Sequence, residues 1–191
     1  MFFDQFIKFL NQYAHIDQPI TAALQHRVII SRFTKRQIVL QPGQICKNLY
    51  YVHKGFFRIF EHTEAGERTI DFATAGEFIT IPHSFFHQEL SNYGIICETD
   101  AYSLAISYHD LRALEEQLDG FLTLSNRITT ALLIRFFDDL NVYRTGNASE
   151  RYRYLLDTYP QITNMVAQKD IASYLGLSQQ TLSRLVRDYI K

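Results

Sequence analysis

The sequence contains few of the residues that build metal clusters, disulfide scaffolds or membrane spans. Its 191 residues include only two cysteines, Cys46 and Cys97, and no tryptophan. Because these cysteines are not arranged as Cys-x-x-Cys, we expect two unpaired thiols and no iron–sulfur cluster or zinc ribbon. No stretch approaches the roughly 18 uninterrupted apolar residues of a membrane span, and the amino-terminal residues lack the basic region of a signal peptide. We therefore expect a cytoplasmic protein without a membrane partner.

A large net charge is also missing. The formal charge is −1 at pH 7, which argues against a protein that holds nucleic acid by bulk electrostatics alone. The charge is unevenly distributed, however. Residues 1–150 carry 13 Lys and Arg against 17 Asp and Glu, whereas residues 151–191 carry 6 against 3. The basic excess therefore lies at the carboxyl end, where a module that contacts phosphates would need it.

The hydrophobic pattern predicts helices at the amino terminus. Residues 2–14 place apolar side chains on one helical face, namely Phe3, Phe6, Ile7, Leu10 and Tyr13. A second short helix is predicted to start after Thr21, which is a plausible N-cap. Hydrophobic residues make up 47% of the chain, which is enough for a substantial core.

Between about Val28 and Ser107 the pattern changes to short apolar runs separated by turn residues. These runs predict strands within residues 28–30, 37–40, 49–52, 56–60, 69–72 and 95–97. Pro42-Gly43, Lys54-Gly55 and Ala75-Gly76 are typical of the turns between them. Many short strands at this spacing favour a small antiparallel barrel or sandwich.

Helices return at Tyr108, and a long helix is predicted over about 121–143. Its apolar residues recur every three or four positions and are Phe121, Leu124, Ile128, Leu132, Phe136 and Leu140. We expect this stripe, with Phe121, Leu124, Ile128, Leu132 and Phe136 as its interface residues, to pack against a second copy of the chain. The alternative is that the stripe packs only on its own barrel. Arg144–Asn147 then breaks the helix and is interpreted as a hinge.

The last forty residues have the pattern of a helix-turn-helix. Ile171, Ala172 and Leu175 are spaced to face the core of the unit, and Gly176 can adopt the positive φ of a tight turn. Ser178 is a favourable N-cap for a second helix, which Leu182, Leu185 and Val186 would hold against the first.

The outward face of that second helix carries amides, a hydroxyl and guanidinium groups, on Gln179, Gln180, Ser183, Arg184 and Arg187. Bidentate amides and guanidinium groups are the side chains that read adenine and guanine edges in the major groove. A generic helical hairpin that binds another protein would also explain the hydrophobic spacing. It does not explain an exposed face with almost no acidic residues, so we favour DNA binding.

With these motifs the chain resembles the catabolite-activator (Crp/Fnr) family of bacterial transcription regulators over nearly its full length. The matching stretches are Gln41-Pro42-Gly43, the run from Leu49 to Arg58, Ala75-Gly76-Glu77-Phe78 and the terminal helix-turn-helix. The resemblance implies an α+β protein with a cyclic-nucleotide-binding-domain-like barrel of double-stranded β-helix type, a dimerisation helix and a winged-helix-like DNA-binding domain. The corresponding domains span residues 1–120, 121–146 and 147–191.

The family also implies how the chain contacts DNA and what its partners are. It places base contacts on Gln179, Gln180 and Arg184, with Ser178 and Thr181 near phosphates. The candidate DNA-binding set is Lys169, Ser178, Gln179, Gln180, Thr181, Ser183, Arg184 and Arg187. The implied partners are double-stranded DNA, a second copy of the chain, a small-molecule effector and RNA polymerase. The function implied is that of a regulator that binds an inverted repeat as a homodimer.

One departure from the family concerns the effector. Family members that bind cyclic AMP follow the Gly-Asp/Glu-Phe turn with a Gly-Glu pair and an Arg that neutralises the cyclic phosphate. Here Gly76-Glu77-Phe78 continues as Ile79-Thr80-Ile81, and no arginine occurs between Arg68 and Arg112. We therefore expect cyclic AMP to bind weakly or not at all. The candidate pocket residues are Gly76, Glu77, Phe78, Ile79, Thr80 and His83.

Other chemistry finds less support in the sequence. His83 and His87 could share a helical face, but a metal site needs three or four ligands, so we expect no metal. Haem sensing stays open, because single axial ligands leave little trace in a sequence. A cupin-like barrel that binds a small molecule or performs metal-dependent catalysis is the alternative. The residues that it would use, Glu61, His62, Glu67 and Asp71, form no recognisable constellation, and we expect no enzyme.

Overall fold

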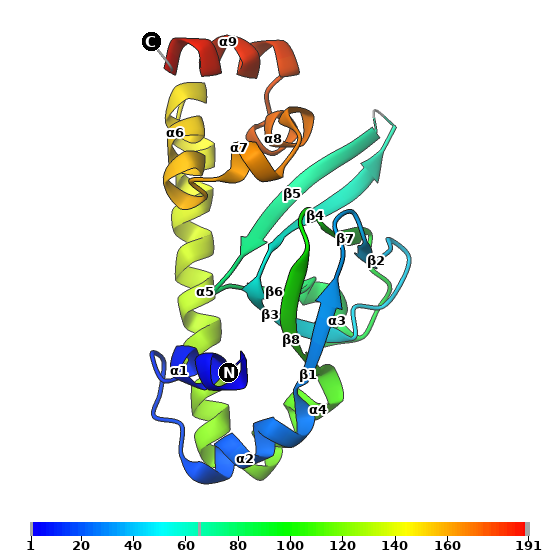
Figure 1. Ribbon diagram of the computed structural model, residues 1–191, viewed down its shortest axis with the longest axis vertical. Coiled ribbons are helices and arrows are strands. Elements are labelled where there is room, and N and C mark those ends of the chain that lie inside the picture. Colours follow the sequence, from blue (N-terminus) through cyan, green and yellow to red (C-terminus); the bar gives the residue numbers. More distant parts are fainter. Residues whose placement is uncertain (1, 65, 190–191) are drawn as a thin grey trace.

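The computed structural model describes residues 2–64 and 66–189, which form a β-barrel, a long helix and a carboxyl-terminal group of helices (Figure 1). The strands are β1 (Ile29–Phe33), β2 (Ile38–Leu40), β3 (Asn48–Lys54), β4 (Phe56–Thr63), β5 (Gly66–Thr74), β6 (Phe78–Ile79), β7 (Tyr93–Cys97) and β8 (Ala101–Ser107). The helices are α1 (Phe2–Leu10), α2 (Gln18–Arg27), α3 (Pro82–His87), α4 (Tyr108–Gln117), α5 (Asp119–Thr145), α6 (Ala148–Thr158), α7 (Ile162–Met165), α8 (Gln168–Leu175) and α9 (Gln179–Tyr189). The predicted fold class is confirmed.

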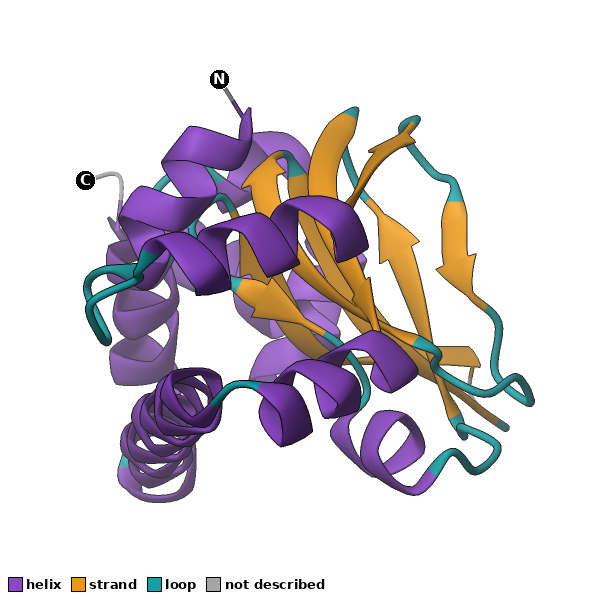
Figure 2. Ribbon diagram, turned by 90° about the horizontal axis from the view of Figure 1, so that it is seen from below, coloured by secondary structure: helices purple, strands orange, loops and turns teal. Residues whose placement is uncertain are grey.

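The barrel consists of two four-stranded antiparallel sheets. One sheet has the order β1-β8-β3-β6 and the other the order β2-β7-β4-β5. Aromatic rings pack between the sheets. The ring of Phe33 lies 5.8 Å from that of Tyr50 in the same sheet and 5.6 Å from that of Phe57 in the other sheet. In the view along α5, helices surround the strands on one side of the barrel (Figure 2).

Two strands and one helix of the barrel were not predicted, namely β6, β8 and α3. β8 pairs with β1 on one side and β3 on the other, and its small side chains, Ala101, Ser103 and Ala105, are all buried. β8 alternates these small residues with Tyr102, Leu104 and Ile106, so it lacks the continuous apolar run from which the other strands are predicted, and β6 is only two residues long. These elements are determined by their neighbours rather than by their own pattern.

The second helix begins before the position predicted for it. Asp17, not Thr21, is the N-cap of α2, and its carboxylate accepts a hydrogen bond from the amide of Ile20 (2.9 Å). Pro19 lies in the first turn, where its missing amide costs no helical hydrogen bond. The first helix, α1, ends at Leu10, before the predicted end at residue 14. Phe6 of the predicted apolar face packs on Tyr51 of the barrel, and Phe9, which the prediction omitted, packs on Tyr51 and Phe78.

The long helix α5 extends two residues beyond each predicted end. Asn147 then caps α6, accepting bonds from the amides of Ser149 and Glu150, while the Glu150 carboxylate accepts from the Asn147 amide. This capping box starts a new helix directly after α5, so the boundary between α5 and α6 lies within residues 144–147, where the sequence predicts a hinge. Within the described part of the chain, no helix combines the length and apolar character needed to cross a bilayer.

The carboxyl-terminal helices share a hydrophobic core with the barrel. The side chains of α6, α7, α8 and α9 that form this core pack around Phe56 and Phe72, which belong to the β4–β5 hairpin. Figure 1 shows this hairpin extending from the barrel toward α8. The helical domain is therefore packed against the barrel through this hairpin as well as joined to it by α5.

Candidate nucleic-acid interface

The turn between α8 and α9 has the geometry that the sequence predicts. Ile171, Ala172, Leu175 and Leu182 are buried in the second core. Gly176 adopts φ +66°, and the amide of Leu177 donates to the carbonyl of Ala172 (2.9 Å). A residue with a β-carbon is strained in this left-handed conformation, so the turn favours glycine.

Ser178 caps the second helix. Its hydroxyl accepts a hydrogen bond from the amide of Thr181 (3.1 Å) and lies 2.8 Å from the Thr181 hydroxyl. These contacts satisfy one of the free amides in the first turn of α9 and fix the direction in which the helix leaves the turn.

One face of α9 forms a shallow hollow lined by hydrogen-bonding side chains. Five of the predicted DNA-binding residues line this hollow, namely Gln179, Gln180, Ser183, Arg184 and Arg187. Gln168, which the prediction omitted, completes the lining. Amide and guanidinium groups dominate this surface, and no carboxylate is among the residues that line it. It can donate to and accept from base edges without repelling phosphates.

The other predicted DNA contacts lie at the border of this surface. Ser178 and Thr181 are exposed at the amino end of α9, where amides point outward and anions are favoured. Lys169 is exposed in the first turn of α8 and does not line the hollow.

The predicted effector residues lie in different surroundings. Gly76 adopts φ +87° in the turn before β6, and Glu77 points toward α5. Phe78 packs outside the barrel on Phe9 and Tyr51, whereas Ile79 is buried. The hydroxyl of Thr80 donates to the carbonyl of Asn48 (3.1 Å), and His83 is exposed on α3.

His83 and His87 do share a face of α3, with ring centroids 4.9 Å apart, and both are exposed. In residues 2–64 and 66–189, no group of three or more His, Cys, Asp or Glu side chains is placed to hold a metal ion. Cys46 and Cys97 are buried free thiols, as predicted.

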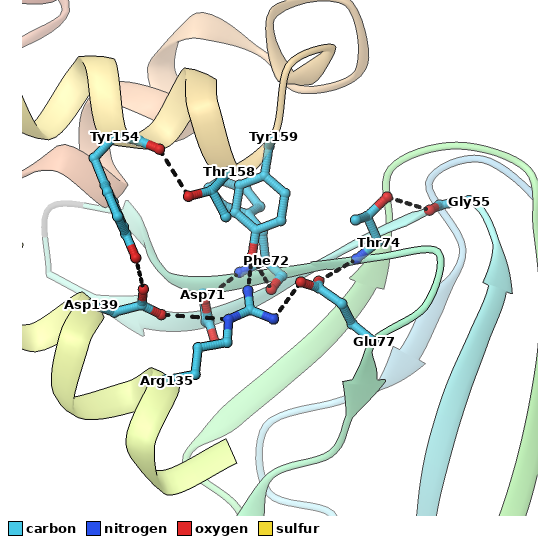
Figure 3. A network of polar contacts seen from close by, with 10 residues as sticks. All are labelled: Gly55, Asp71, Phe72, Thr74, Glu77, Arg135, Asp139, Tyr154, Thr158 and Tyr159. Atoms are coloured by element: carbon cyan, nitrogen blue, oxygen red, sulfur yellow. Dashed lines mark hydrogen bonds and ion pairs between the residues drawn. The ribbon is translucent and has the colours of Figure 1, made fainter. Parts of the chain in front are cut away.

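A polar network joins the barrel, the long helix and the helical domain (Figure 3). Arg135 of α5 forms an ion pair with Glu77 of the barrel, and its Nη2 donates to the hydroxyl of Tyr159 (3.0 Å), the residue after α6. The Tyr159 hydroxyl donates in turn to the carbonyl of Phe72 in β5 (3.0 Å). Tyr154 of α6 donates to Asp139 of α5. Each of the three parts of the molecule thus contacts the other two.

The electrostatics of this network keep its donors protonated. Burial alone lowers the pKa of Arg135, but Glu77, Tyr159 and Asp139 together outweigh burial, and the pKa is raised. Burial raises the pKa of Tyr159, an effect that nearby Glu77 and Asp71 increase. The sequence analysis did not single out Arg135 or Tyr159. For Arg135 the sequence did offer a signal, because it is the single charged residue in the apolar stretch of residues 132–137.

The apolar stripe of α5 divides between the chain's own core and the surface. Phe121 and Leu124, predicted as interface residues, are only 4% and 1% exposed and pack within their own chain, which corrects that part of the prediction. Ile128 is half-buried. Leu132 and Phe136 remain exposed, and further large apolar side chains on the same helix are exposed with them, namely Leu122, Leu133, Ile134, Phe137 and Leu140.

Comparison with known proteins agrees with this architecture. Residues 30–117 match the family model for the cyclic nucleotide-binding domain. No curated protein matches the sequence. The solved structures that resemble it include the c-di-GMP-responsive global regulator CLP of Xanthomonas campestris, at 18% identity over 91% of each chain and a TM-score of 0.69.

Two further solved structures extend the likeness. A transcriptional regulator of the Crp/Fnr family from Eubacterium rectale is 14% identical, with 95% of this chain and 87% of that chain covered and a TM-score of 0.71. FixK2 of Bradyrhizobium japonicum is 18% identical, with 84% of this chain and 83% of that chain covered and a TM-score of 0.66. The chain contains a cyclic nucleotide-binding-type domain and has the overall fold of the Crp/Fnr family of transcription regulators.

Proposed function

We propose that this protein is a transcription regulator that binds a specific inverted repeat in DNA as a homodimer. The observation that carries the proposal is the exposed hollow on α9, where Gln179, Gln180 and Arg184 lie together on a helix anchored by its leucines. A helix of this kind enters the major groove and reads base edges with these side chains. The basic excess of residues 151–191 supplies attraction for the phosphates.

The exposed part of the α5 stripe supports the homodimer. Phe136 is 60% and Phe137 62% exposed in the single chain, and neighbouring Leu133 and Ile134 are exposed as well. A contiguous set of large apolar side chains on one long helix is characteristic of a helix–helix interface. Two copies joined there present two α9 helices related by a two-fold axis, which fits half-sites about 34 Å apart.

The effector that we propose for the barrel is not cyclic AMP. The stretch from Thr69 to Leu111 contains no arginine to neutralise a cyclic phosphate. Glu77 is already paired with Arg135. A cyclic nucleotide would therefore lose its phosphate hydration without gaining a bidentate ion pair. Calorimetry with cyclic AMP and cyclic GMP tests this, and micromolar affinity for either would contradict it.

Selection of genomic DNA fragments by the purified protein tests the proposed function. We expect enrichment of fragments that share an inverted repeat, with affinity that falls steeply as salt is raised because bound counterions are released. The double variant Gln180→Ala, Arg184→Ala should lose the enrichment. The matched control Gln25→Ala, Arg32→Ala changes exposed residues of the same types outside residues 151–191 and should keep it. Failure of the native protein to retain any duplex at low salt would exclude DNA binding and favour a protein-interaction role for the helical hairpin.

A further inference from the structure

The contact between α8 and the β4–β5 hairpin contains a cluster of buried charges. Arg58 of β4 is buried there, and its Nε donates to Glu98 (2.7 Å) and its Nη2 to Glu67 (3.0 Å). Arg36 forms an ion pair with the second oxygen of Glu98 (2.8 Å). Within the barrel, two guanidinium groups are thus matched by two carboxylates. The charges of the barrel part therefore balance without any contribution from the helical domain, although Glu98 Oε2 has its ion pair with Arg36 and no hydrogen-bond partner among the described residues.

Asp170, in the first turn of α8, brings a third carboxylate to this cluster. Its side chain is buried, and its Oδ1 lies 3.9 Å from Arg58 Nη1, which is too far for a hydrogen bond. Its Oδ2 has no hydrogen-bond partner among the described residues. A buried carboxylate needs hydrogen bonds as well as an ion pair to offset the loss of its hydration. The contact with α8 therefore buries one additional negative charge, that of Asp170, without the hydrogen bonds that would offset its lost hydration.

The contacts around Asp170 are favourable. The amide of Thr69 in β5 donates to the hydroxyl of Ser173 in α8 (3.0 Å). The ring of Phe72 lies 4.8 Å from that of Tyr174. The register between β4 and β5 shifts at this point, so that Ile70 is an extra residue in β5 and the strand bends locally. The hairpin thus offers α8 a backbone donor and an apolar surface, with one unfavourable charge between them.

We propose that Asp170 is a positioning residue that weakens the packing of the helix-turn-helix on the β4–β5 hairpin, so that this contact opens while the barrel and α5 stay folded. On opening, Asp170 regains water, and Arg58 keeps Glu98 and Glu67 as partners. The apolar and Ser173 contacts favour closure. The consequence for DNA rests on the proposed function, because opening lets α9 change its direction relative to α5 to match the spacing of two half-sites.

Hydrogen exchange of the full chain, followed by mass spectrometry, measures opening without DNA. In Asp170→Asn, which keeps the shape and removes the charge, we expect exchange in β5 and α8 to slow about fivefold. Ser173→Ala removes a favourable contact and should speed the same peptides by a similar factor. Asp157→Asn neutralises an exposed carboxylate of α6 and should leave them unchanged. Unchanged or faster exchange in Asp170→Asn would overturn the proposal.

Binding of the selected operator by fluorescence anisotropy tests the consequence for DNA. Because a more tightly closed contact restricts α9, we expect Asp170→Asn to bind the operator several-fold more weakly than the native protein. Slower exchange with unchanged operator affinity would refute the link to DNA. If the native protein binds no DNA, the proposed function fails, and the exchange rates of the two variants still decide whether Asp170 opposes closure.

Discussion

Arg135 in α5 and Tyr159 after α6 are joined by a hydrogen bond of 3.0 Å, and each is also bound to the barrel. Arg135 reaches the barrel through Glu77, and Tyr159 through the carbonyl of Phe72. A displacement of the turn that carries Glu77 therefore acts on the long helix and on the helical domain together. This triangle gives the effector that we propose for the barrel a physical route to the direction of α9.

The energetic coupling within this triangle can be measured directly. We expect Arg135→Gln and Glu77→Gln each to lower the free energy of unfolding, because each leaves a charged group without its partner. The double variant should lose less than the sum of the two, with a coupling energy of about 1 kcal/mol. Urea unfolding of the four proteins gives this value. Additive losses would show that the two side chains stabilise the protein independently.

Arg184 is expected to read a base. Arg184→Ala should cost about 1–3 kcal/mol on the selected operator and relax discrimination at one position of the half-site. Competition binding against operators substituted at each position measures both effects. Arg153→Ala, an exposed arginine on α6, is the control and should leave specificity unchanged. An equal loss of affinity for every sequence in Arg184→Ala would identify a phosphate contact instead.

The exposed apolar side of α5 is expected to hold the dimer together. Phe136→Asp places a charge among apolar residues that the single chain leaves exposed. Sedimentation should show the variant as a monomer at concentrations where the native protein is a dimer, because an unpaired carboxylate is costly to bury. Gln25→Asp, at an exposed position of α2, should remain dimeric. A monomeric native protein would contradict the proposed assembly.

Asp71 is expected to make stability depend on pH. Asp71 is an exposed residue of β5, but the protein around its carboxyl group removes part of its hydration, which raises its pKa from 3.8 to about 6 against the opposing effects of the Phe72 amide and Arg135. The folded protein thus holds a proton that the unfolded chain releases at lower pH, so this contribution is complete below about pH 4 and is lost as the pH rises through 6.

Unfolding of Asp71→Asn between pH 4 and 7 tests this expectation. The variant should gain stability relative to the native protein as the pH rises across that range. Asp138→Asn, which neutralises an exposed carboxylate of α5, serves as the control and should not reproduce the change. A constant difference between Asp71→Asn and the native protein at every pH would show that Asp71 does not titrate in this range.

The helix-turn-helix could be predicted from the sequence because its determinants are local. Gly176 provides the turn and Ser178 the cap, and Leu182 recurs at the helical spacing that places it on the buried side. These residues act on neighbours a few positions away, so their pattern is readable along the chain. The packing of the apolar stripe of α5 could be predicted only in part. Helical periodicity shows which residues share a face but not that the chain's own core covers Phe121 and Leu124 and leaves Phe136 exposed.

The sequence by itself determined the strand-rich amino-terminal part, the long amphipathic helix and the chemistry of the outward face of α9. Only the tertiary structure decided which charges meet. Arg135 lies 58 positions from Glu77 and 24 from Tyr159, and Asp170 meets Arg58 across the contact between α8 and β4. Local propensities carry no information about such pairs, because they depend on how separate elements pack together. The same packing decides which buried carboxylate oxygens, Asp170 Oδ2 and Glu98 Oε2, have no hydrogen-bond partner among the described residues.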